Sequence, residues 1–344
     1  MTELEQPINT IVGMIDKHHE DKQEPPRYHF GLSQCGHDCD RWLWLSFRWS
    51  VIERFEGRML RLFRRGHNEE HTIVHDLRAI GLEIENAGEY NQYRVNLGSH
   101  VSGSLDGIIK SGVPDAPNKK HILEAKTHNL KSFQDLIRKG VEESKPMHYA
   151  QMQVYMESSG IDRALYVAVC KNDDRMYTER VKLKKKEAKF FKEKYIGRAK
   201  RIAMSERIPE PFKTDSTWYQ CKMCAAHDFC YGSKTTKEVN CRTCARATPK
   251  EDNTFFCERW QSTIPNNQQL KGCPSHVLHP DLVPWQLKEG KDENTATYLI
   301  EGKEVCNGEN GLKSSEIIAN PKACAKEDSF TQALRSEFNA TITG

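Results

Sequence analysis

The sequence predicts an α/β fold, with a central mixed β-sheet flanked by helices and a cysteine-rich metal-binding region toward the C-terminus. Short apolar runs typical of strands alternate with stretches of helical periodicity up to about residue 207. From residue 221 onward the composition shifts to cysteine, short loops and few apolar residues. The chain of 344 residues is also long enough to bury a sizeable core in one large domain or two.

The first part of the chain is predicted to be largely helical. Residues 1–30 are polar and indicate an N-terminal helix and linker, with Gln-Glu-Pro-Pro at 23–26 breaking the helix. Residues 31–65 are rich in tryptophan and then in arginine. Residues 66–80 predict a helix that Gly81 ends. Its buried face is predicted to carry Ile73, Leu77 and Ile80.

Strand-like runs follow this helix. They are predicted around 82–97, 100–110, 120–127, 163–170 and 176–183. The last two are expected to pair, and a helix is predicted over 145–158. After Trp285, short segments with Asn-Gly turns predict small hairpins.

The net charge of +3 is unremarkable, but the charge is unevenly distributed. Between Arg180 and Arg207 there are twelve Lys and Arg against three Glu, with Phe190, Phe191 and Tyr195 among them. Two compatible interpretations remain open, a solvated amphipathic helix and a basic surface that steers nucleic acid. The sequence has no run of eighteen apolar residues and no signal-peptide core, so we expect no membrane segment and a cytoplasmic protein.

Three residues in two of the apolar runs carry the strongest chemical signal. Asp106 closes one run in Ser-Leu-Asp-Gly, and Glu124 and Lys126 straddle one residue of Ile-Leu-Glu-Ala-Lys. Residues i and i+2 of a strand share a face, so Glu124 and Lys126 project together, and Asp106 joins them if the runs pair. Two carboxylates and an ammonium there would hold a divalent cation and activate a water against a phosphodiester. The competing interpretation is an ordinary Asp-Gly turn and a Glu-x-Lys on a solvated strand edge.

This pattern resembles the PD-(D/E)XK nuclease superfamily. The surrounding residues resemble its RecB-like branch with an iron–sulfur cluster, which includes CRISPR-associated and AddB-type members. The resemblance covers about residues 31–232. It implies a restriction-endonuclease-like core, Mg²⁺- or Mn²⁺-dependent deoxyribonuclease activity, and DNA as the partner. In overall style the chain is also similar to bacteriophage-encoded nucleases, which would place it in the host cytoplasm.

The resemblance implies a third carboxylate in the metal centre. In the family, an acidic residue or a His about four positions after a helical Gly reaches the metal. Here Glu70 follows Gly66 at that distance, and His71 is the adjacent alternative. Asp106 and Glu124, with Glu70 behind them, would then bind one or two Mg²⁺ or Mn²⁺ ions, and the backbone carbonyl of residue 125 would complete the oxygen shell.

The resemblance also assigns the remaining catalytic residues. Lys126 would orient or help deprotonate the attacking water and stabilise the transition state. Gln151 and Tyr155 match the family's Gln-x-x-x-Tyr motif and share a helical face, where they would touch the DNA backbone and support Lys126. Gln153 lies off that face and is the weaker candidate.

The twelve cysteines, in a reducing compartment, favour metal ligation over disulfides. Three of them form the motif Cys221-x2-Cys224-x5-Cys230. The resemblance implies that Cys39, which precedes Arg41 and Trp44, is the fourth ligand of a 4Fe–4S cluster. Such a cluster would close a long loop around the core and stabilise it. Zinc held by four thiolates is the alternative, and Cys35 is a rival for Cys39.

A second cysteine group predicts a zinc site. It reads Cys241-x2-Cys244-x12-Cys257-x15-Cys273-x2-His276. The four cysteines are the predicted ligands with His276 in reserve, and the module needs its metal to fold because it has few apolar residues. Besides this structural role, DNA contact is open through Arg242, Arg246 and Lys250. Buried or free thiols are expected at Cys170, Cys306 and Cys324.

These features predict four regions along the chain. They are an N-terminal helix and linker at 1–30, a nuclease core closed by the iron–sulfur cluster at 31–232, a zinc module at 233–285 and a hairpin region at 286–344. The main functional hypothesis is a metal-dependent DNA nuclease, with exonuclease activity favoured. The rival is a non-catalytic, zinc-containing nucleic-acid-binding or interaction protein on a degenerate nuclease core. The sequence lacks a Walker A lysine motif, so any helicase or recombination protein would be a separate partner.

Overall fold

The computed structural model describes residues 10–88, 92–288, 294–309, 311–338 and 340–342. Residue contacts divide the chain into two units. Unit 1 comprises Met1–Gly36 and Arg54–Ala199, and unit 2 comprises His37–Glu53 and Lys200–Gly344. The four regions proposed from the sequence stay predictions. No helix in the described ranges is both long enough and apolar enough to cross a membrane.

Unit 1 contains a five-stranded mixed sheet. In spatial order its strands are β2 (Glu83–Glu85), β5 (Gly107–Ser111), β6 (His121–His128), β7 (Arg163–Cys170) and β8 (Met176–Lys182). β6 and β7 are parallel, and the other neighbours are antiparallel. A parallel pair needs a long crossover connection, which two helices between β6 and β7 supply. The predicted mixed α/β architecture is confirmed.

A smaller sheet in unit 1 corrects two of the predicted strands. It contains β1 (Phe30–Gly31), β4 (Val101–Ser104) and β3 (Arg94–Gly98), in that order. The run at 100–110 is therefore two strands, because the chain leaves the small sheet after β4 and enters the large sheet at β5. The run at 82–97 likewise contains β2 and β3, and its residues 89–91 lie outside the described ranges. Leu105 stays fully buried through the bend, so the apolar pattern alone does not mark the change of sheet.

The helices of unit 1 follow the predicted pattern in part. They are α1 (Ile11–Asp21), η1 (Leu32–Gln34), α3 (Gly57–Ala79), α4 (Leu130–Ser144), α5 (Pro146–Ser159), α6 (Lys185–Phe191) and η2 (Lys192–Gly197), with α7 (Arg198–Met204) following. α3 starts earlier than predicted and ends before Gly81, whose φ of +95° suits glycine. Ile73 and Leu77 are buried as predicted, but Ile80 is 75% exposed because it lies beyond the last helical turn.

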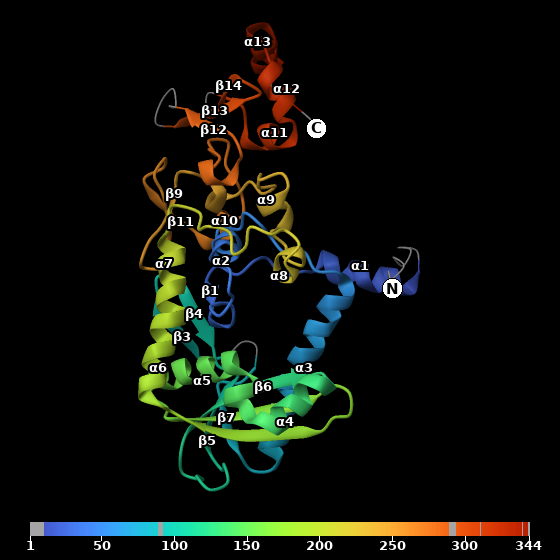
Figure 1. The fold of residues 1–344 in the computed structure, drawn as a ribbon, viewed down its shortest axis with the longest axis vertical. Coiled ribbons are helices and arrows are strands. Elements are labelled where there is room, and N and C mark those ends of the chain that lie inside the picture. The colour runs from blue at the N-terminus through green and yellow to red at the C-terminus, as the bar shows by residue number, and fades with distance from the viewer. Residues whose placement is uncertain (1–9, 89–91, 289–293, 310, 339, 343–344) are drawn as a thin grey trace. The chain divides into compact units, whose positions relative to one another are not determined.

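Helices cover both faces of the large sheet. α3 packs on the face that carries Leu123 and Ala125 of β6. Side chains alternate along a strand, so Glu124 and Lys126 point to the other face, where α4 and α5 run beside β6 (Figure 1). α5 matches the predicted helix at 145–158. α4 was not predicted, and its periodicity is interrupted by non-helical Gly140 (φ +72°).

The basic segment after β8 forms α6, η2 and α7. Ala188, Ile196 and Ala199 are buried, whereas Phe190 is 57% exposed, so this segment is an amphipathic helical stretch. The interpretation as a partly solvated helix is confirmed. Its role in steering nucleic acid stays a prediction.

Unit 2 contains two small antiparallel sheets. They are β11 (Ser262–Ile264), β10 (Phe255–Cys257) and β9 (Ala247–Pro249), and β12 (Gln286–Lys288), β13 (Thr295–Ile300) and β14 (Lys303–Gly308), each in spatial order. β13 and β14 form a predicted hairpin. Its turn is Glu301-Gly302, both with positive φ, rather than an Asn-Gly pair.

Short helices make up the rest of unit 2. They are α2 (Asp40–Phe47), α8 (Tyr219–Lys222), α9 (His227–Tyr231), η3 (Cys241–Thr243), α10 (Asn266–Gln269), η4 (Pro280–Leu282), α11 (Ser314–Ala319), α12 (Pro321–Lys326) and α13 (Ser329–Phe338). α2 buries Leu43, Trp44 and Leu45 completely, and its tryptophan-rich sequence thus supplies core. The sequence patterns did not predict α11, α12 or α13.

Candidate active site and cysteine clusters

The structure brings Asp106, Glu124 and Lys126 together on the α4/α5 side of the large sheet. Gly107 of β5 pairs with Leu123 of β6, which sets Asp106 beside the strand that carries the other two residues. Asp106 Oδ2 accepts hydrogen bonds from the Ala125 backbone N–H (2.8 Å) and from Lys126 Nζ (3.4 Å). Glu124 Oε1 lies 2.5 Å from Lys126 Nζ. The predicted convergence is therefore present, while the catalytic roles stay predictions.

Burial and charge shift the ionisation of this group. Burial raises the pKa of Glu124 to about 7, against the opposing effect of Lys126. Burial alone would lower the pKa of Lys126, but Asp106 and Glu124 raise it above its ordinary value, so its ammonium stays charged at neutral pH. Strong shifts of this kind, caused by burial together with charged partners, are typical of functional sites.

Glu70 of α3 belongs to the same electrostatic cluster. Burial raises its pKa to about 7, and the nearby charge of Asp106 adds to the rise. Its Oε1 accepts a hydrogen bond from Gln92 Nε2 (3.2 Å). The adjacent alternative, His71, is exposed on the helix. The structure thus favours Glu70 over His71 as the third side chain of the candidate metal site.

These residues fit a hard divalent cation by their chemistry. They offer carboxylate oxygens, the donors that Mg²⁺ and Mn²⁺ prefer. Glu124 is 1% exposed, and a buried carboxylate oxygen is costly unless a cation balances it. In the arrangement described, Lys126 provides that balance. Within the described ranges, no three His, Cys, Asp or Glu side chains are close enough together to hold a metal ion as they stand.

Tyr155 and Gln151 lie on α5, but Tyr155 does not face solvent. Tyr155 is 2% exposed, and its hydroxyl donates to the Ser104 carbonyl (3.0 Å). A Cβ added at Gly103 would lie 2.2 Å from this hydroxyl, so glycine is required there. Gln151 hydrogen-bonds Tyr155. Tyr155 therefore fixes the end of β4 just before Asp106, and the predicted contact of its side chain with a DNA backbone does not fit this burial.

Gln153, the weaker candidate near that motif, makes hydrogen bonds to the backbone in the interior of the protein. It is fully buried, its Nε2 donates to the Lys182 carbonyl (2.9 Å), and its Oε1 accepts from the Lys184 backbone N–H (2.9 Å). Gln153 thereby joins α5 to the end of β8.

Beside Lys126 lies a hydrogen-bonded group that the sequence analysis missed. The Tyr166 hydroxyl lies 2.9 Å from His128 Nε2 and 2.9 Å from His148 Nδ1. Tyr166 has one hydroxyl proton, so it donates to one ring and accepts from the other. Burial lowers the pKa of His128 to about 4 and that of His148 to about 3. Since His128 is two residues after Lys126 on β6, extending the two-residue period would have placed it on this face.

We expect the histidine group to make unit 1 less stable in acid. A histidine of the unfolded chain titrates near pH 6.5, whereas His128 and His148 stay neutral in the fold down to about pH 4 and 3. The unfolded state then binds more protons below pH 6.5, so the free energy of unfolding falls as the pH drops from 6.5 toward 4, by at most about 1.4 kcal/mol per pH unit for each histidine. Urea unfolding between pH 4.5 and 7.5 measures it. The His148→Asn variant should show a smaller dependence, and an equal slope would contradict the assignment.

The first cysteine cluster forms within unit 2. Cys39 caps α2 and accepts from the Trp42 backbone N–H (3.3 Å). Burial raises the pKa of Cys224 to about 11, and the nearby thiols of Cys39, Cys230 and Cys221 raise it further. Arg41 hydrogen-bonds Cys230. The predicted four cysteines and the arginine are thus neighbours, and four thiolates are the donor type of an iron–sulfur or zinc site, so this cluster stays a prediction.

The rival Cys35 is not part of this cluster. It lies in unit 1 at the end of η1, is 1% exposed, and donates from Sγ to the Gly31 carbonyl (3.5 Å). Burial raises the pKa of its thiol to about 12. A buried thiol of this kind is inert and serves as core.

The second cysteine cluster also forms within unit 2. Cys241, Cys244, Cys257 and Cys273 line one pocket of about 510 Å³. Burial is the main cause that raises the pKa of Cys241, and the other three thiols raise it further, to about 12. His276, held in reserve from the sequence, is already engaged: Nδ1 bonds Ser314 Oγ (2.7 Å), and Nε2 lies 3.0 Å from the Asn240 carbonyl. His276 is therefore the weaker candidate, and zinc binding by the four cysteines stays a prediction.

The structure separates the three basic residues of this module. Arg242 is 1% exposed, lies over the Trp49 ring (3.7 Å), and donates from Nη1 to the Phe47 carbonyl (2.8 Å). The interpretation that Arg242 contacts DNA is therefore wrong, because its side chain is buried in the core. Lys250 remains 44% exposed beside Glu258. The cysteines without ligand spacing are free thiols, and of these Cys170 and Cys324 are buried.

Comparisons with known proteins add little to these observations. No family model and no curated protein matches the chain. Among solved structures, SSO0001 is 14% identical with a TM-score of 0.39, covering 65% of this chain and 98% of its own. An alkaline exonuclease from Laribacter hongkongensis is 14% identical with a TM-score of 0.34, covering 54% and 92%. A phage-related exonuclease from Haemophilus somnus is 20% identical with a TM-score of 0.29, covering 39% and 66%. Likenesses this weak do not bear on the activity of this chain.

Proposed function

We propose that this protein is a Mg²⁺- or Mn²⁺-dependent DNA nuclease that acts as an exonuclease. The observation that carries the proposal is the convergence of Asp106, Glu124 and Lys126 at a buried, strongly charged site, with Glu70 beside them. An Asp-Gly turn and a Glu-x-Lys pair on a solvated strand edge would not bury Glu124 to 1% exposure. A structural ion pair alone would not need two further carboxylates at the same place.

In this proposal the carboxylates hold the cation and the lysine contacts the substrate. Asp106 and Glu124, with Glu70, would bind one or two ions. A bound Mg²⁺ or Mn²⁺ supplies positive charge to the scissile phosphate and lowers the pKa of a water. Lys126 would donate hydrogen bonds to the phosphate oxygens as charge develops there, and would orient or help deprotonate the attacking water.

The remaining residues hold this geometry. The Ala125 backbone N–H fixes Asp106, and Tyr155 fixes the strand end before it through the Ser104 carbonyl. The neutral group formed by His128, Tyr166 and His148 packs beside Lys126 without adding a competing charge at neutral pH. A rigid surround of this kind keeps catalytic atoms in place at little cost during the reaction.

Degradation of end-labelled DNA tests the proposal. We expect the purified chain to shorten single- or double-stranded DNA from an end when Mg²⁺ or Mn²⁺ is present, and circular DNA of the same sequence to resist. Cleavage should stop when the divalent ion is withheld. Inertness on linear DNA and RNA, with folded protein, occupied cysteine clusters and added metal, would instead favour the non-catalytic nucleic-acid-binding alternative.

A further inference from the structure

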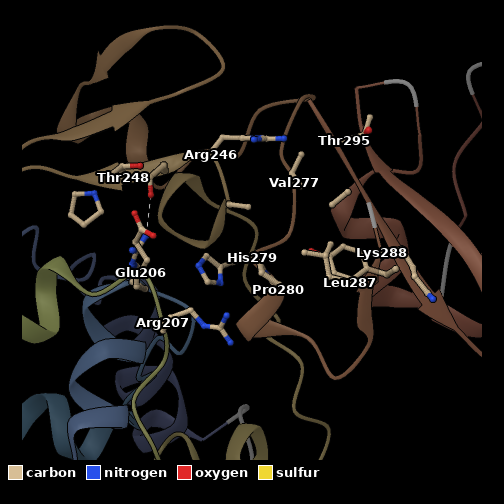
Figure 2. Close-up of a pocket in the computed structure, with 16 residues that line it drawn as sticks. Glu206, Arg207, Arg246, Thr248, Val277, His279, Pro280, Leu287, Lys288 and Thr295 are labelled. Atoms are coloured by element: carbon tan, nitrogen blue, oxygen red, sulfur yellow. Dashed lines mark hydrogen bonds between the residues drawn. The ribbon is translucent and has the colours of Figure 1, made fainter. Parts of the chain in front are cut away.

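A pocket of about 680 Å³ lies within unit 2 (Figure 2). The residues that line it include no cysteine of either cluster. One side comes from the segment 245–249, which follows Cys244 and enters β9. Another comes from β12 and β13, and the turn around His279 and Pro280 lies between them. The size is that of sites that take small molecules.

Arg48 gives this pocket a buried positive charge. It is 2% exposed and donates from Nη1 to the Ala247 carbonyl (3.0 Å) and from Nη2 to the Ser205 carbonyl (3.3 Å). Its Nε has no hydrogen-bond partner. Both hydrogen-bonded partners are neutral carbonyls, and Glu206 is the carboxylate whose charge acts on the guanidinium, so Nε remains an unused donor at the lining. A buried charge in this state is stabilised by an anion.

Arg246 adds a second charge with an unused donor. Its Nε is also buried without a hydrogen-bond partner. Figure 2 shows its side chain extended along the side of the pocket opposite Arg207, with His279 between them. Arg207 is already balanced, because its Nε lies 3.0 Å from Asp281 Oδ2. Burial lowers the pKa of His279 to about 4, so this ring adds no charge at neutral pH.

The rest of the lining defines what the anion is attached to. Lys288 adds a positive charge at the exposed edge, and the carboxylate in the lining is Glu206, which acts on Arg48. Val277, Leu287 and Ala296 form an apolar side. The guanidinium fork matches the oxygen geometry of a phosphate. An apolar side next to such donors suits a compact organic group that carries the phosphate.

We propose that this pocket binds the phosphate of a nucleotide unit, with Arg246 and Arg48 at the phosphate and the apolar side against the nucleoside. The unit is either a free nucleotide or one within a nucleic-acid strand, and the recognition chemistry is the same. The proposal stands apart from the proposed cleavage, because it uses residues of unit 2 and is tested on a chain that cannot cut.

Binding of two probes to the full chain carrying Lys126→Ala tests the pocket. The probes are deoxyadenosine monophosphate, followed by calorimetry, and a labelled single-stranded oligonucleotide, followed by fluorescence anisotropy. Arg246→Ala should weaken binding of at least one probe by roughly tenfold or more, as loss of a charge-assisted hydrogen bond does. Lys303→Ala removes the same charge from an exposed position of β14 in the same unit, outside the pocket lining, and should change binding less than about twofold.

A second pair of variants separates charge from folding. Leu287 is 46% exposed, so Leu287→Asp and Leu287→Asn should fold alike, while only the aspartate repels a phosphate. Weaker binding of the monophosphate in Arg246→Ala and Leu287→Asp assigns the pocket to free nucleotides. Weakening of the oligonucleotide alone assigns it to a strand. Unchanged binding of both probes in both variants, or no binding of either probe at millimolar concentration, overturns the proposal.

Discussion

Replacing Lys126 with alanine should abolish DNA cleavage while leaving DNA binding largely intact. Lys126 Nζ contacts Glu124, Asp106 and the Ala125 carbonyl, and its ammonium is the donor that we assign to the phosphate. Loss of one such donor from a buried site slows an enzyme by roughly 10²–10³-fold or more. The measurements are the single-turnover cleavage rate and the dissociation constant for an oligonucleotide, both at saturating Mg²⁺.

Two further variants make this result specific. Lys126→Met keeps most of the side-chain volume without the charge and should be as slow as alanine. Lys110→Ala removes an exposed lysine of β5 that pairs with Glu83 and Glu85, and should cleave at the normal rate. Near-normal cleavage by Lys126→Ala and Lys126→Met would exclude the assigned role of the ammonium. Equal loss in all three variants would point to a general effect of surface charge.

Much of this candidate site could be predicted because it depends on the two-residue period of strands. Glu124 and Lys126 share a face in any β-strand, and the pairing of β5 with β6 places Asp106 beside them. The bend between β4 and β5 could not be predicted, since Leu105 is buried whichever sheet it joins. The group around Tyr166 was missed because its members come from β6, β7 and α5, and local sequence does not encode contacts among three separate elements.

The cysteine spacings predicted which thiols gather but not every choice among them. The spacing left His276 in reserve, and Ser314, a residue 38 positions later, occupies its Nδ1. The spacing likewise did not predict that Arg242 is buried. Its neighbours in the motif are predicted ligands, but its own side chain packs on Trp49. Both outcomes depend on contacts with distant segments, which local spacing does not encode.

Cys39 lies in unit 2 and Cys35 lies in unit 1, and this difference determines which chain segments a metal cluster would link. Unit 2 is assembled from two pieces of chain, 37–53 and 200–344, with the whole sheet region of unit 1 between them in sequence. Cys39 lies on the first piece, and Cys221, Cys224 and Cys230 lie on the second. A cluster held by all four would link the two pieces, and closing a loop of that length stabilises a fold by about 5 kcal/mol in the chain-entropy treatment of crosslinks.

Cys39→Ala should therefore remove the metal of the first cluster and destabilise unit 2, whereas Cys35→Ala should do neither. Iron, sulfide and zinc contents, absorbance near 400 nm and the Tm measure this. Iron with sulfide identifies the 4Fe–4S cluster, and zinc alone identifies the alternative. The Cys35→Ala variant removes the same sulfur from a buried site in unit 1 and should lower the stability by only about 1 kcal/mol, with full metal content.

The temperature dependence of cleavage shows how the cluster acts. If it stabilises the fold and takes no part in the chemistry, the Cys39→Ala chain should cleave DNA at the normal rate per folded molecule at low temperature. It should then lose activity at temperatures where the normal chain and Cys35→Ala remain folded. A rate that is reduced a hundredfold at low temperature, in a chain whose circular dichroism is unchanged, would show that the cluster serves the reaction itself. Retention of metal and Tm by Cys39→Ala would remove this residue from the ligand set, because the three remaining cysteines would then suffice.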